Sequence, residues 1–553
     1  MEISDLKKSA RGMGHAGPCR VLPNRDGSGM MRGMGRFFNV AGPCIPGEHY
    51  LLPSERRCAD LLPLIEQNQY FVIHAARQTG KTTLLKSIVS TLNRGGRYLA
   101  IYSSVEQLRA APQPQTGIPS LLHVLKDDLQ CLPGMETFDF LEGIDLADPH
   151  TALRKALHQL ARKAGKPTVI FFDEADSLRE DLLICFLTQL RGGYIGRDTA
   201  AFPQSIALVG MRDLRDYKAS VREGRKRLGG GSPFNIVTES LTLRNFSREE
   251  TAELYGQHTA DTGQVFEPDA VDFVFRQTDG QPWLVNAVAR ECIEKILQRD
   301  FSKPVTGELV EQAIQNIILR RDTHIDSLIE KLKEERVRKI VEPVLTGDKR
   351  EFNSADDDCR YALDLGLLKN DREGLCPANP IYAEVMIRML SLLAQERMAD
   401  MQLSTPLARY SQGGGLDMKK LLKDFQAFWR ENAEMMGDAS DYREAVPHLV
   451  LQAFLQRILN GGGRIHREFA VGRRRMDLLI EWEKGRYPLE IKLWRGEKTE
   501  EEGLAQLGNY LERVNCPEGW LVLFDRRPER SWDEKIFWRE AGSKNRKIHI
   551  AGC

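Results

Sequence analysis

The stretch Tyr70-Phe-Val-Ile-His-Ala-Ala-Arg-Gln-Thr-Gly80-Lys81-Thr82-Thr83 decides the fold of the N-terminal half of this chain. An apolar strand runs into a tight loop, and a Lys-Thr pair opens a helix. Backbone N–H groups at such a loop and at the helix N-terminus point toward an anion, and the helix dipole favours its negative charge. The spacing predicts a phosphate-binding loop in which Lys81 reaches the β- and γ-phosphates and the Thr82 hydroxyl binds Mg²⁺.

The loop departs from the pattern G-x-x-x-x-G-K-[ST] at its first position, where Ala75 replaces glycine. Alanine fits there provided that its φ is negative. The alternative is a chance Gly-Lys-Thr in a strand-to-helix connection, but the strand before it and the helix after it favour a phosphate site. The expected nucleotide-binding residues are Arg77, Gln78, Thr79, Gly80, Lys81, Thr82 and Thr83.

A second apolar run ends in the acids Asp173-Glu174-Ala-Asp176. Four apolar residues in a row indicate a strand buried on both faces, as parallel strands are. Such a strand places the acids at the carboxyl edge, where α/β sheets bind ligands. We expect Asp173 to hold Mg²⁺ through water and Glu174 to polarise an attacking water. An acidic helix N-cap is the alternative.

Two more strands complete the predicted sheet, over residues 205–213 and 234–243. In P-loop ATPases a polar residue at the end of such a strand senses the γ-phosphate, and Arg212 or Asp213 fits that position. The last strand precedes Ser247-Arg-Glu-Glu, which is a good helix N-cap sequence.

These features resemble the additional-strand, catalytic-glutamate branch of P-loop ATPases. More narrowly, residues 36–300 resemble bacterial AAA-like ATPases related to the archaeal-ATPase and STAND groups. The resemblance rests also on Phe38-Asn-Val-Ala-Gly-Pro-Cys44 with His49-Tyr-Leu-Leu-Pro53, and on Thr278-Asp-Gly-Gln-Pro282-Trp-Leu-Val-Asn286. It implies ATP as the nucleotide and a helical lid with Pro282 near it. An ordinary helix start with Pro in its first turn is the alternative for Pro282.

Composition fits a multi-domain protein of the cytoplasm. The chain has 553 residues, 42% of them hydrophobic, and its 78 Lys and Arg balance 78 Asp and Glu. Nucleic acid would therefore have to bind a local patch. Ten cysteines without a C-x-x-C pair indicate reduced thiols and argue against structural zinc. No run of about 18 apolar residues occurs, so no membrane span is expected.

The last 130 residues predict a second α/β domain. Asp477 lies on one strand, Glu490-Ile-Lys492 on the next, and Gln506 precedes Tyr510 by one helical turn. The order helix–strand–strand–strand–helix–strand with these residues resembles the PD-(D/E)XK nuclease fold, and Gln-x-x-x-Tyr resembles its exonuclease-type branch. Isolated carboxylates and lysines on solvated strand faces are the alternative explanation.

The spacing of these residues suits phosphodiester cleavage. Strand side chains alternate faces, so Glu490 and Lys492 share one side. Two carboxylates, Asp477 and Glu490, can hold Mg²⁺ or Mn²⁺, with Glu444 as a further candidate ligand. Lys492 would hold the attacking water or stabilise the pentavalent transition state, and Gln506 lies on the same helical face as Tyr510. A basic patch supports a nucleic-acid partner, although a solvated turn would also explain it; its members are Arg464, Arg467, Arg473, Arg474 and Arg475.

The predicted organisation has six parts: a disordered extension (1–35), a P-loop ATPase core (36–247), a helical lid (248–304), a winged-helix-like domain (305–400), a linker or helix (401–435) and a nuclease-like domain (436–553). In the fourth part, helices precede an extended pair at 363–369 and 374–379. Asp356-Asp357-Asp358 would repel DNA there. We therefore expect this module to pack against the ATPase core or a partner.

The sequence thus predicts an ATPase whose C-terminal domain cleaves nucleic acid, with DNA as the expected substrate, by a metal-dependent reaction under ATP control. The alternative is a STAND-like ATP switch whose nuclease-like domain is inactive and only binds nucleic acid or a protein. A homo-oligomer is left open, in which a neighbour's arginine completes the ATP site. The candidates for that arginine are Arg215, Arg225 and Arg227.

Overall fold

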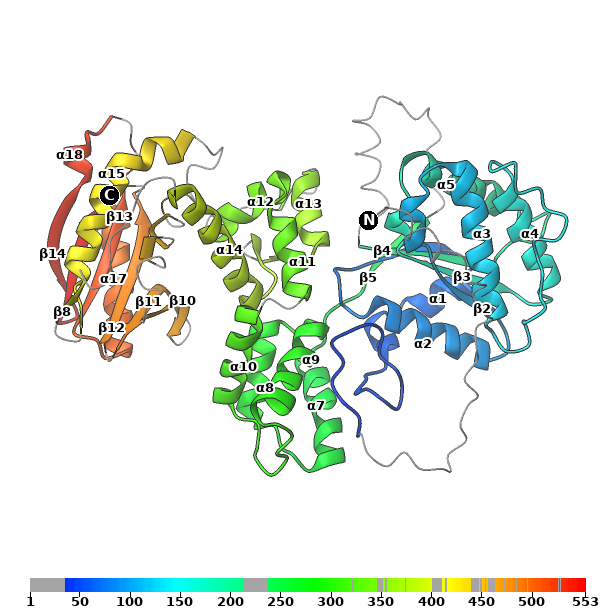
Figure 1. Cartoon of the computed structure of the whole chain (residues 1–553), viewed down its shortest axis with the longest axis horizontal. Helices are drawn as coiled ribbons and strands as arrows, with labels where there is room; N and C mark the ends of the chain where they lie inside the picture. The colour runs from blue at the N-terminus through cyan, green and yellow to red at the C-terminus, as the bar shows by residue number, and fades with distance from the viewer. Residues whose placement is uncertain are drawn as a thin grey trace, which may run out of the picture. The chain divides into compact units, whose positions relative to one another are not determined.

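The computed structural model describes residues 35–211, 237–320, 323–345, 352–353, 356–372, 374–399 and most of 410–553. Breaks in the last stretch fall at 413–414, 439–446, 448–449, 453, 456–462, 472–473, 484, 495, 526 and 528. The predicted disordered extension therefore lies almost entirely outside the described residues. The chain divides into two compact units, with the division between Gln264 and Val265 (Figure 1).

The first unit is built on a five-stranded parallel sheet with the strand order β2-β3-β4-β1-β5. Strand β4 lies between β1, which leads into the phosphate-binding loop, and β3, which ends in Asp173. The additional strand implied by the resemblance is therefore present. The strands are β1 (Tyr70–His74), β2 (Leu99–Ser104), β3 (Thr168–Asp173), β4 (Ser205–Gly210) and β5 (Val237–Thr242).

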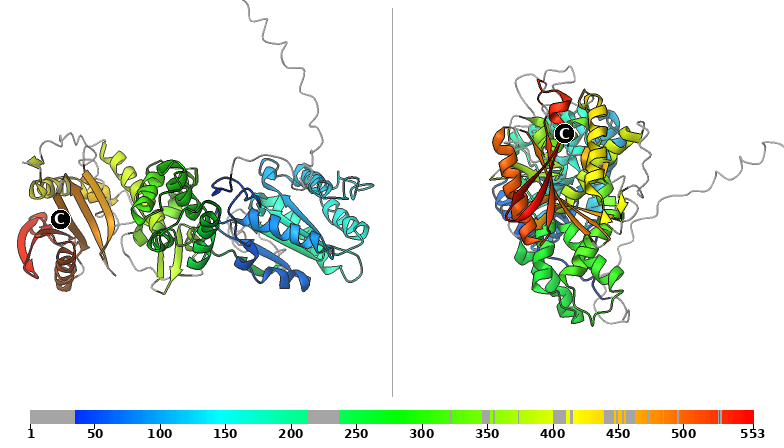
Figure 2. Two further views of the ribbon diagram at one scale, coloured as in Figure 1. Left: turned by 90° about the horizontal axis from the view of Figure 1, so that it is seen from below. Right: turned by 90° about the vertical axis from the view of Figure 1, so that its left-hand side faces the viewer.

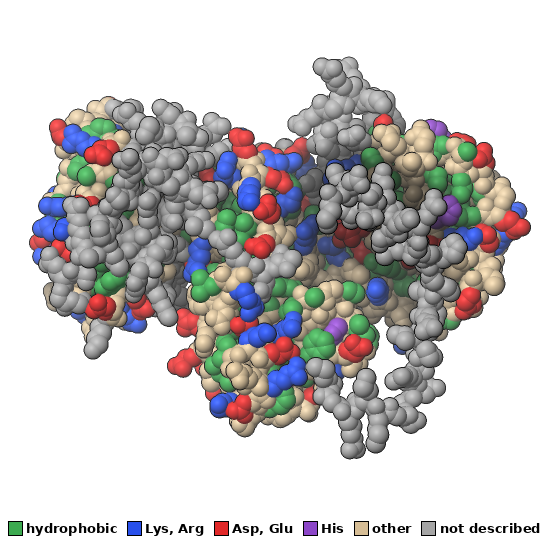
Figure 3. Space-filling view, viewed as in Figure 1, with side chains coloured by type: hydrophobic (Ala, Val, Ile, Leu, Met, Phe, Trp, Pro, Cys, Tyr) green, Lys and Arg blue, Asp and Glu red, His purple; other side chains and the backbone are tan. Residues whose placement is uncertain are grey.

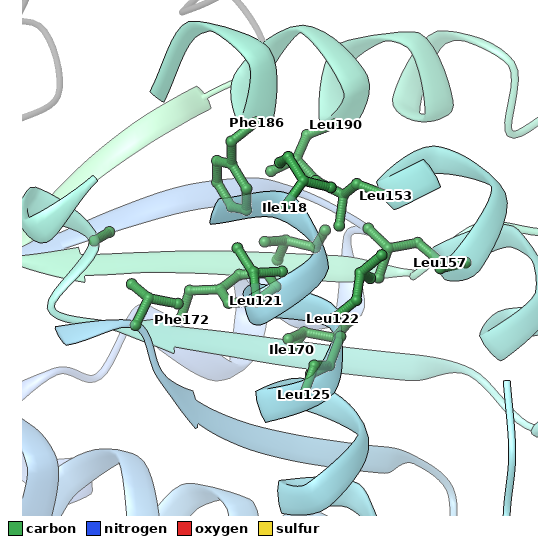
Figure 4. Packing of buried hydrophobic residues seen from close by; sticks show 14 of the residues in the cluster. Ile118, Leu121, Leu122, Leu125, Leu153, Leu157, Ile170, Phe172, Phe186 and Leu190 are labelled. Atoms are coloured by element: carbon green, nitrogen blue, oxygen red, sulfur yellow. The ribbon is translucent and has the colours of Figure 1, made fainter. Parts of the chain in front are cut away.

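Helices cover both faces of this sheet, as the apolar strands require. Alternate residues of one strand face opposite layers: Val72 packs with one cluster, and Phe71 and Ile73 with the other. Helices α1 (Leu61–Glu66) and α2 (Lys81–Arg94) cover one face. The opposite face is covered by α3 (Pro114–Gln130), α4 (Ala152–Lys163) and α5 (Glu180–Ile195) (Figure 4).

Short elements connect the layers of the first unit. They are the 3-10 helices η1 (Ser54–Arg57), η2 (Glu106–Ala110) and η3 (Ala175–Ser177). After β5 comes α7 (Arg248–Thr262), which begins at the predicted N-cap. The Ser247 hydroxyl accepts from the Glu250 N–H at 3.2 Å, and the Glu250 carboxylate accepts from the Ser247 N–H at 2.8 Å. This reciprocal pair satisfies two N–H groups of the helix start.

The second unit begins with helices and a small hairpin. On the face shown in Figure 3, basic and acidic side chains of these helices are mixed, in line with the balanced charge of the chain. The elements are α8 (Pro268–Thr278), α9 (Pro282–Arg290), the π-helical η6 (Glu291–Ile296), α10 (Gly307–Arg320), α11 (Thr323–Leu332), α12 (Glu335–Leu345), α13 (Asp357–Asp364), β6 (Leu368–Asp371), β7 (Gly374–Pro377) and α14 (Pro380–Ala399).

The structure corrects the expected start of the hairpin at residue 363. Leu363 and Asp364 belong to α13, and β6 begins only at Leu368, because Gly366 in the left-handed region (φ +74°) ends the helix first. The three neighbouring acids serve the start of this helix. Asp356 caps it by accepting from the N–H groups of Asp358 and Cys359, Asp357 pairs with Arg360, and Asp358 pairs with Arg336 at 3.0 Å.

The C-terminal part of this unit contains a six-stranded mixed sheet of order β10-β11-β12-β13-β15-β14. Helix α15 (Met418–Asp438) and described residues of 450–455 pack on one face, and α17 (Glu497–Arg513) on the other (Figure 2). Strands β14 and β15 and helix α18 were not predicted. The remaining elements are β8 (Ser411–Gln412), β9 (Gly415–Leu416), β10 (Gly463–Val471), β11 (Arg474–Trp482), β12 (Gly485–Leu493), β13 (Glu518–Phe524), α18 (Trp532–Lys535), β14 (Phe537–Ser543) and β15 (Arg546–Gly552).

Among the residues that the structure describes, no helix has both the length and the apolar character needed to cross a bilayer.

The layer between α3, α4, α5 and the sheet is expected to dominate the stability of the first unit. Leu122 is fully buried there, so Leu122→Ala should cost about 2–5 kcal/mol of its unfolding free energy. Ile195 is 65% exposed, and Ile195→Ala should change it by less than about 0.5 kcal/mol. The measurement is unfolding of the full chain, followed in the transition that bound nucleotide shifts upward. Equal effects of the two variants would contradict this packing.

Candidate functional site

The predicted phosphate-binding loop joins the carboxyl end of β1 to the first turn of α2. Gly80 is the N-cap residue of α2 with φ +89°, in the left-handed region that glycine adopts without strain. A Cβ at this position would also lie 3.3 Å from Arg57 Nη1. Ala75, which replaces the first glycine of the pattern, has a negative φ, as that substitution requires. Gln78 (φ +58°) and Arg77 are exposed, whereas Thr79 is buried.

Lys81 lies inside the loop. Its side chain is buried, and Nζ donates to the carbonyl oxygens of Ala75 (2.7 Å) and Ala76 (2.9 Å). Burial lowers the pKa of Lys81, and the nearby carboxylates of Glu174 and Asp173 oppose that shift. The ammonium group is therefore held in the bend of the loop, next to the helix start that favours an anion.

Thr82 and Asp173 meet although 91 residues separate them in the chain. The Thr82 hydroxyl donates to Asp173 Oδ2 at 2.8 Å, because α2 begins beside the carboxyl end of β3. A hydroxyl and a carboxylate are oxygen ligands of the kind that Mg²⁺ takes. This pair therefore fits the metal that a bound nucleoside triphosphate brings with it. The Thr83 hydroxyl instead accepts from the Cys44 N–H at 3.1 Å.

Tyr102 is a residue of this site that sequence reasoning missed. It lies on β2, which pairs with β3, and its hydroxyl donates to Asp173 Oδ2 at 3.0 Å. Burial, and then the negative charge of Asp173, raise the pKa of Tyr102, so the phenol remains a hydrogen-bond donor. Nothing in the strand Leu-Ala-Ile-Tyr-Ser-Ser marked it, because the contact depends on the order of strands in the sheet.

Glu174 follows Asp173 in a conformation that is uncommon for a residue with a side chain, with φ +57°. Burial raises the pKa of its carboxyl, and the charge of Asp176 adds to the shift. Asp176 Oδ2 in turn accepts from the Met211 N–H at 3.4 Å, at the end of β4. Positions 212 and 213, where a γ-phosphate sensor was expected, lie outside the described residues, as do the candidate arginines at 215, 225 and 227.

Pro282 is the first residue of α9 and is buried. The Gln281 side chain caps this helix by accepting from the Leu284 N–H at 2.7 Å. Pro282 belongs to the second unit, so its expected approach to the nucleotide stays a prediction.

Four predicted residues of the C-terminal domain form one chain of contacts. Glu490 on β12 is fully buried, and its Oε1 lies 2.8 Å from Lys492 Nζ. Lys492 Nζ also donates to Gln506 Oε1 on α17 at 3.1 Å. Gln506 Nε2 donates to the Tyr510 hydroxyl at 3.0 Å. Strand and helix thus bring together an acid, a cation and two groups that orient the cation.

Asp477 is described through its backbone, in β11. Leu478 pairs with Leu489 across the β11–β12 ladder, so the next positions along the two strands are 477 and 490. Leu479, in phase with 477, packs with Tyr510 of α17, the helix that also faces Glu490 and Lys492. The register therefore brings position 477 beside Glu490 on the α17 face.

Other parts of the predicted nuclease site are not described. Glu444 and the side chains of the basic patch lie outside the described residues. Within the described part of the chain, no group of three His, Cys, Asp or Glu residues is arranged to hold a metal ion.

Comparison with known proteins identifies a family model that matches the region of this site. The family model described as the AAA domain matches residues 65–217. No curated protein matches the chain. Among solved structures the chain is similar to the Walker-type ATPase paby2304 of Pyrococcus abyssi, at 14% identity and a TM-score of 0.45 over 63% of this chain and 99% of that chain.

Two further solved structures are similar at lower TM-scores. One is the RuvB Holliday junction branch migration motor of Thermotoga maritima, at 13% identity and a TM-score of 0.31 over 60% of this chain and 92% of that chain. The other is Drosophila ORC bound to DNA, at 15% identity and a TM-score of 0.32 over 68% and 96%. These values are too low to carry a conclusion about function. The conclusion about function rests instead on the family match and on the geometry of the loop. The matched region, residues 65–217, belongs to an AAA-type P-loop ATPase domain that binds ATP.

The Tyr102 contact predicts a dependence on metal concentration. Tyr102→Phe removes a hydroxyl donor to Asp173 and leaves Thr82 in place, and loss of such an outer partner typically weakens a metal site about 10-fold or more. We expect the Mg²⁺ concentration for half-maximal ATP hydrolysis to rise by about that factor. Tyr98→Phe is the matched control, because the buried Tyr98 hydroxyl has no hydrogen-bond partner among the residues that the structure describes. An unchanged Mg²⁺ requirement in Tyr102→Phe would contradict the assignment.

Proposed function

We propose that this protein is an ATPase that controls metal-dependent cleavage of nucleic acid by its C-terminal domain, with DNA as the expected substrate. The observation that carries the proposal is the contact chain Glu490–Lys492–Gln506–Tyr510 on the same polypeptide as an AAA-type P-loop domain. The order of strands and helices around that chain resembles the PD-(D/E)XK nuclease fold.

In the ATPase domain each residue has a task set by its position. The N–H groups of the loop and the first turn of α2 bind phosphate oxygens, and Lys81 neutralises their charge. Thr82 and Asp173 hold Mg²⁺, which offsets negative charge on the triphosphate. Glu174 orients and polarises the attacking water, a role that its half-buried carboxylate at the strand end supports. The residues present fit ATP and Mg²⁺ as cofactors.

In the C-terminal domain the burial of Glu490 is the main support. A carboxylate that is fully removed from water is costly unless a charge partner or hydrogen bonds compensate it, and Lys492 supplies that partner. We assign Asp477 and Glu490 to holding Mg²⁺ or Mn²⁺ and Lys492 to stabilising negative charge on the scissile phosphate. Gln506 positions Lys492 and is itself positioned by Tyr510.

The alternative is a STAND-like ATP switch whose C-terminal domain is inactive and only binds nucleic acid or a protein. The ion pair between Lys492 and Glu490 fits this alternative, because it gives the buried carboxylate a charge partner within the protein. Cleavage assays separate the two functions, because only the first requires the charged groups to act on a phosphodiester.

A plasmid nicking assay with Mg²⁺ or Mn²⁺ tests the nuclease site. Glu490→Gln and Lys492→Ala should each reduce cleavage at least about 100-fold, the loss typical of removing one transition-state stabiliser. Lys498→Ala is the matched control, because Lys498 lies on the same domain but is exposed at the start of α17. Nicking by Lys492→Ala at the wild-type rate would exclude this site as the source of activity.

Lys81→Ala tests the proposed control by ATP. The loss of the buried ammonium should abolish ATP turnover, and it should make cleavage independent of added ATP without unfolding the C-terminal domain. Nicking is measured with and without ATP for both proteins. Cleavage that is the same in all four reactions would reject the coupling while leaving the nuclease assignment standing.

A further inference from the structure

Arg57 is a buried cation that contacts the phosphate-binding loop. It is the last residue of η1, is 5% exposed, and its Nη2 donates to the Thr79 carbonyl at 2.7 Å. Thr79 immediately precedes Gly80, whose missing Cβ leaves room for the guanidinium, since an added Cβ would lie 3.3 Å from Nη1. Arg57 thus fixes the direction of the carbonyl that directly precedes Gly80, where the backbone is left-handed (φ +89°).

The same guanidinium also contacts the connector between β5 and α7. Its Nε donates to the Arg244 carbonyl at 2.8 Å, and Nη2 donates to it at 2.5 Å. The ring of Phe246 lies 4.9 Å from the guanidinium carbon, within cation–π range. One planar, rigid group therefore joins two backbone segments that are 165 residues apart, as the numbers of Thr79 and Arg244 give.

The connector is in turn fixed to the first turn of α7. The Arg244 side chain makes a bidentate ion pair with Glu250, at 2.6 and 2.8 Å. Glu250 also closes the capping box with Ser247. A displacement of Arg244 therefore displaces the start of α7. Conversely, a displacement of α7 is passed through Arg244 to Arg57.

The rest of α7 is tied to the segment that carries Arg57. The Gln257 side chain bonds both the N–H and the carbonyl of Leu51. Arg56 also pairs with Glu253 at 2.9 Å, but both side chains are about half exposed, so this pair contributes little to the attachment. The Tyr50 hydroxyl lies 3.1 Å from His258 Nδ1. These contacts hold residues 50–57 against α7, and Arg57 connects this assembly to the phosphate-binding loop.

Keeping Arg57 charged in this place has a cost. Burial lowers the pKa of Arg57 to about 10, although the negative charge of Glu250 opposes the shift. At neutral pH the side chain is still protonated. A buried donor that loses its acceptor costs free energy, and the cost is larger when the donor is charged. If the Thr79 and Arg244 carbonyls moved apart, Arg57 would lose an acceptor, so independent movement of the two carbonyls is unfavourable.

We propose that Arg57 is a positioning residue that couples the phosphate-binding loop to the first turn of α7. The inference concerns the ATPase unit and holds whether or not the C-terminal domain cleaves nucleic acid. Occupation of the loop by phosphates fixes the Thr79–Gly80 peptide, and Arg57 transmits that restraint to the connector and α7. Because coupling between sites is reciprocal, loosening the connector lowers the affinity of the loop for nucleotide by the same factor.

The test compares two neighbouring arginines in the full chain. Arg57→Lys keeps the charge but loses the planar fork that reaches both carbonyls, whereas Arg56→Lys alters an exposed pair with Glu253. ADP with Mg²⁺ is titrated by fluorescence, and hydrogen exchange of the amides of 244–252 is followed with and without ADP. We expect Arg57→Lys to bind ADP about 10-fold more weakly, the size of one lost charged hydrogen bond, and to lose the ADP-dependent protection. Arg56→Lys should keep both.

Three results would overturn the proposal: wild-type affinity in Arg57→Lys, ADP-dependent protection of 244–252 that persists in that variant, or equal losses in Arg56→Lys. Glu250→Gln serves if Arg57→Lys does not fold. It breaks the ion pair with Arg244 and leaves the loop sequence untouched. Coupling requires that it too weaken ADP binding, and unchanged affinity in this variant would refute it.

Discussion

The hydrogen bond between Thr82 and Asp173 is the contact on which the ATPase unit depends. It exists because five parallel strands end at one edge, with β4 separating the strand before the loop from the strand that ends in Asp173. The loop alone offers N–H groups and one lysine, which suffice for an anion. Asp173 at the end of β3 converts that anion site into one suited to a metal-bound triphosphate.

The groups around this contact show how a sheet edge is made rigid. Tyr102 restrains Asp173 from the edge strand, and Arg57 restrains the loop through the Thr79 carbonyl. Each of them fixes a residue of the nucleotide site. A site held from two directions loses little conformational entropy when the ligand binds, which favours both affinity and correct geometry.

The central carboxylate of the C-terminal domain is also buried, but it lies within a strand, whereas Asp173 ends its strand. Glu490 is compensated by Lys492, and the lysine is held by Gln506 and Tyr510 from a helix. Removing one partner of such a buried ion pair is costly, because the other charge is then left buried without compensation. Such a pair therefore suits a site whose charged groups must stay in place.

The sequence by itself determined the phosphate-binding loop, the buried strand that ends in Asp173, the cap at Ser247, and the strand and helix order around Glu490 and Lys492. These features are local, since they follow from the alternation of strand residues and from motifs a few residues long. Only the tertiary structure decided the contacts of Tyr102 and Arg57 and the added strands β14 and β15. Those contacts join residues far apart in the chain, and which residues meet depends on strand order and helix packing, which no local pattern encodes.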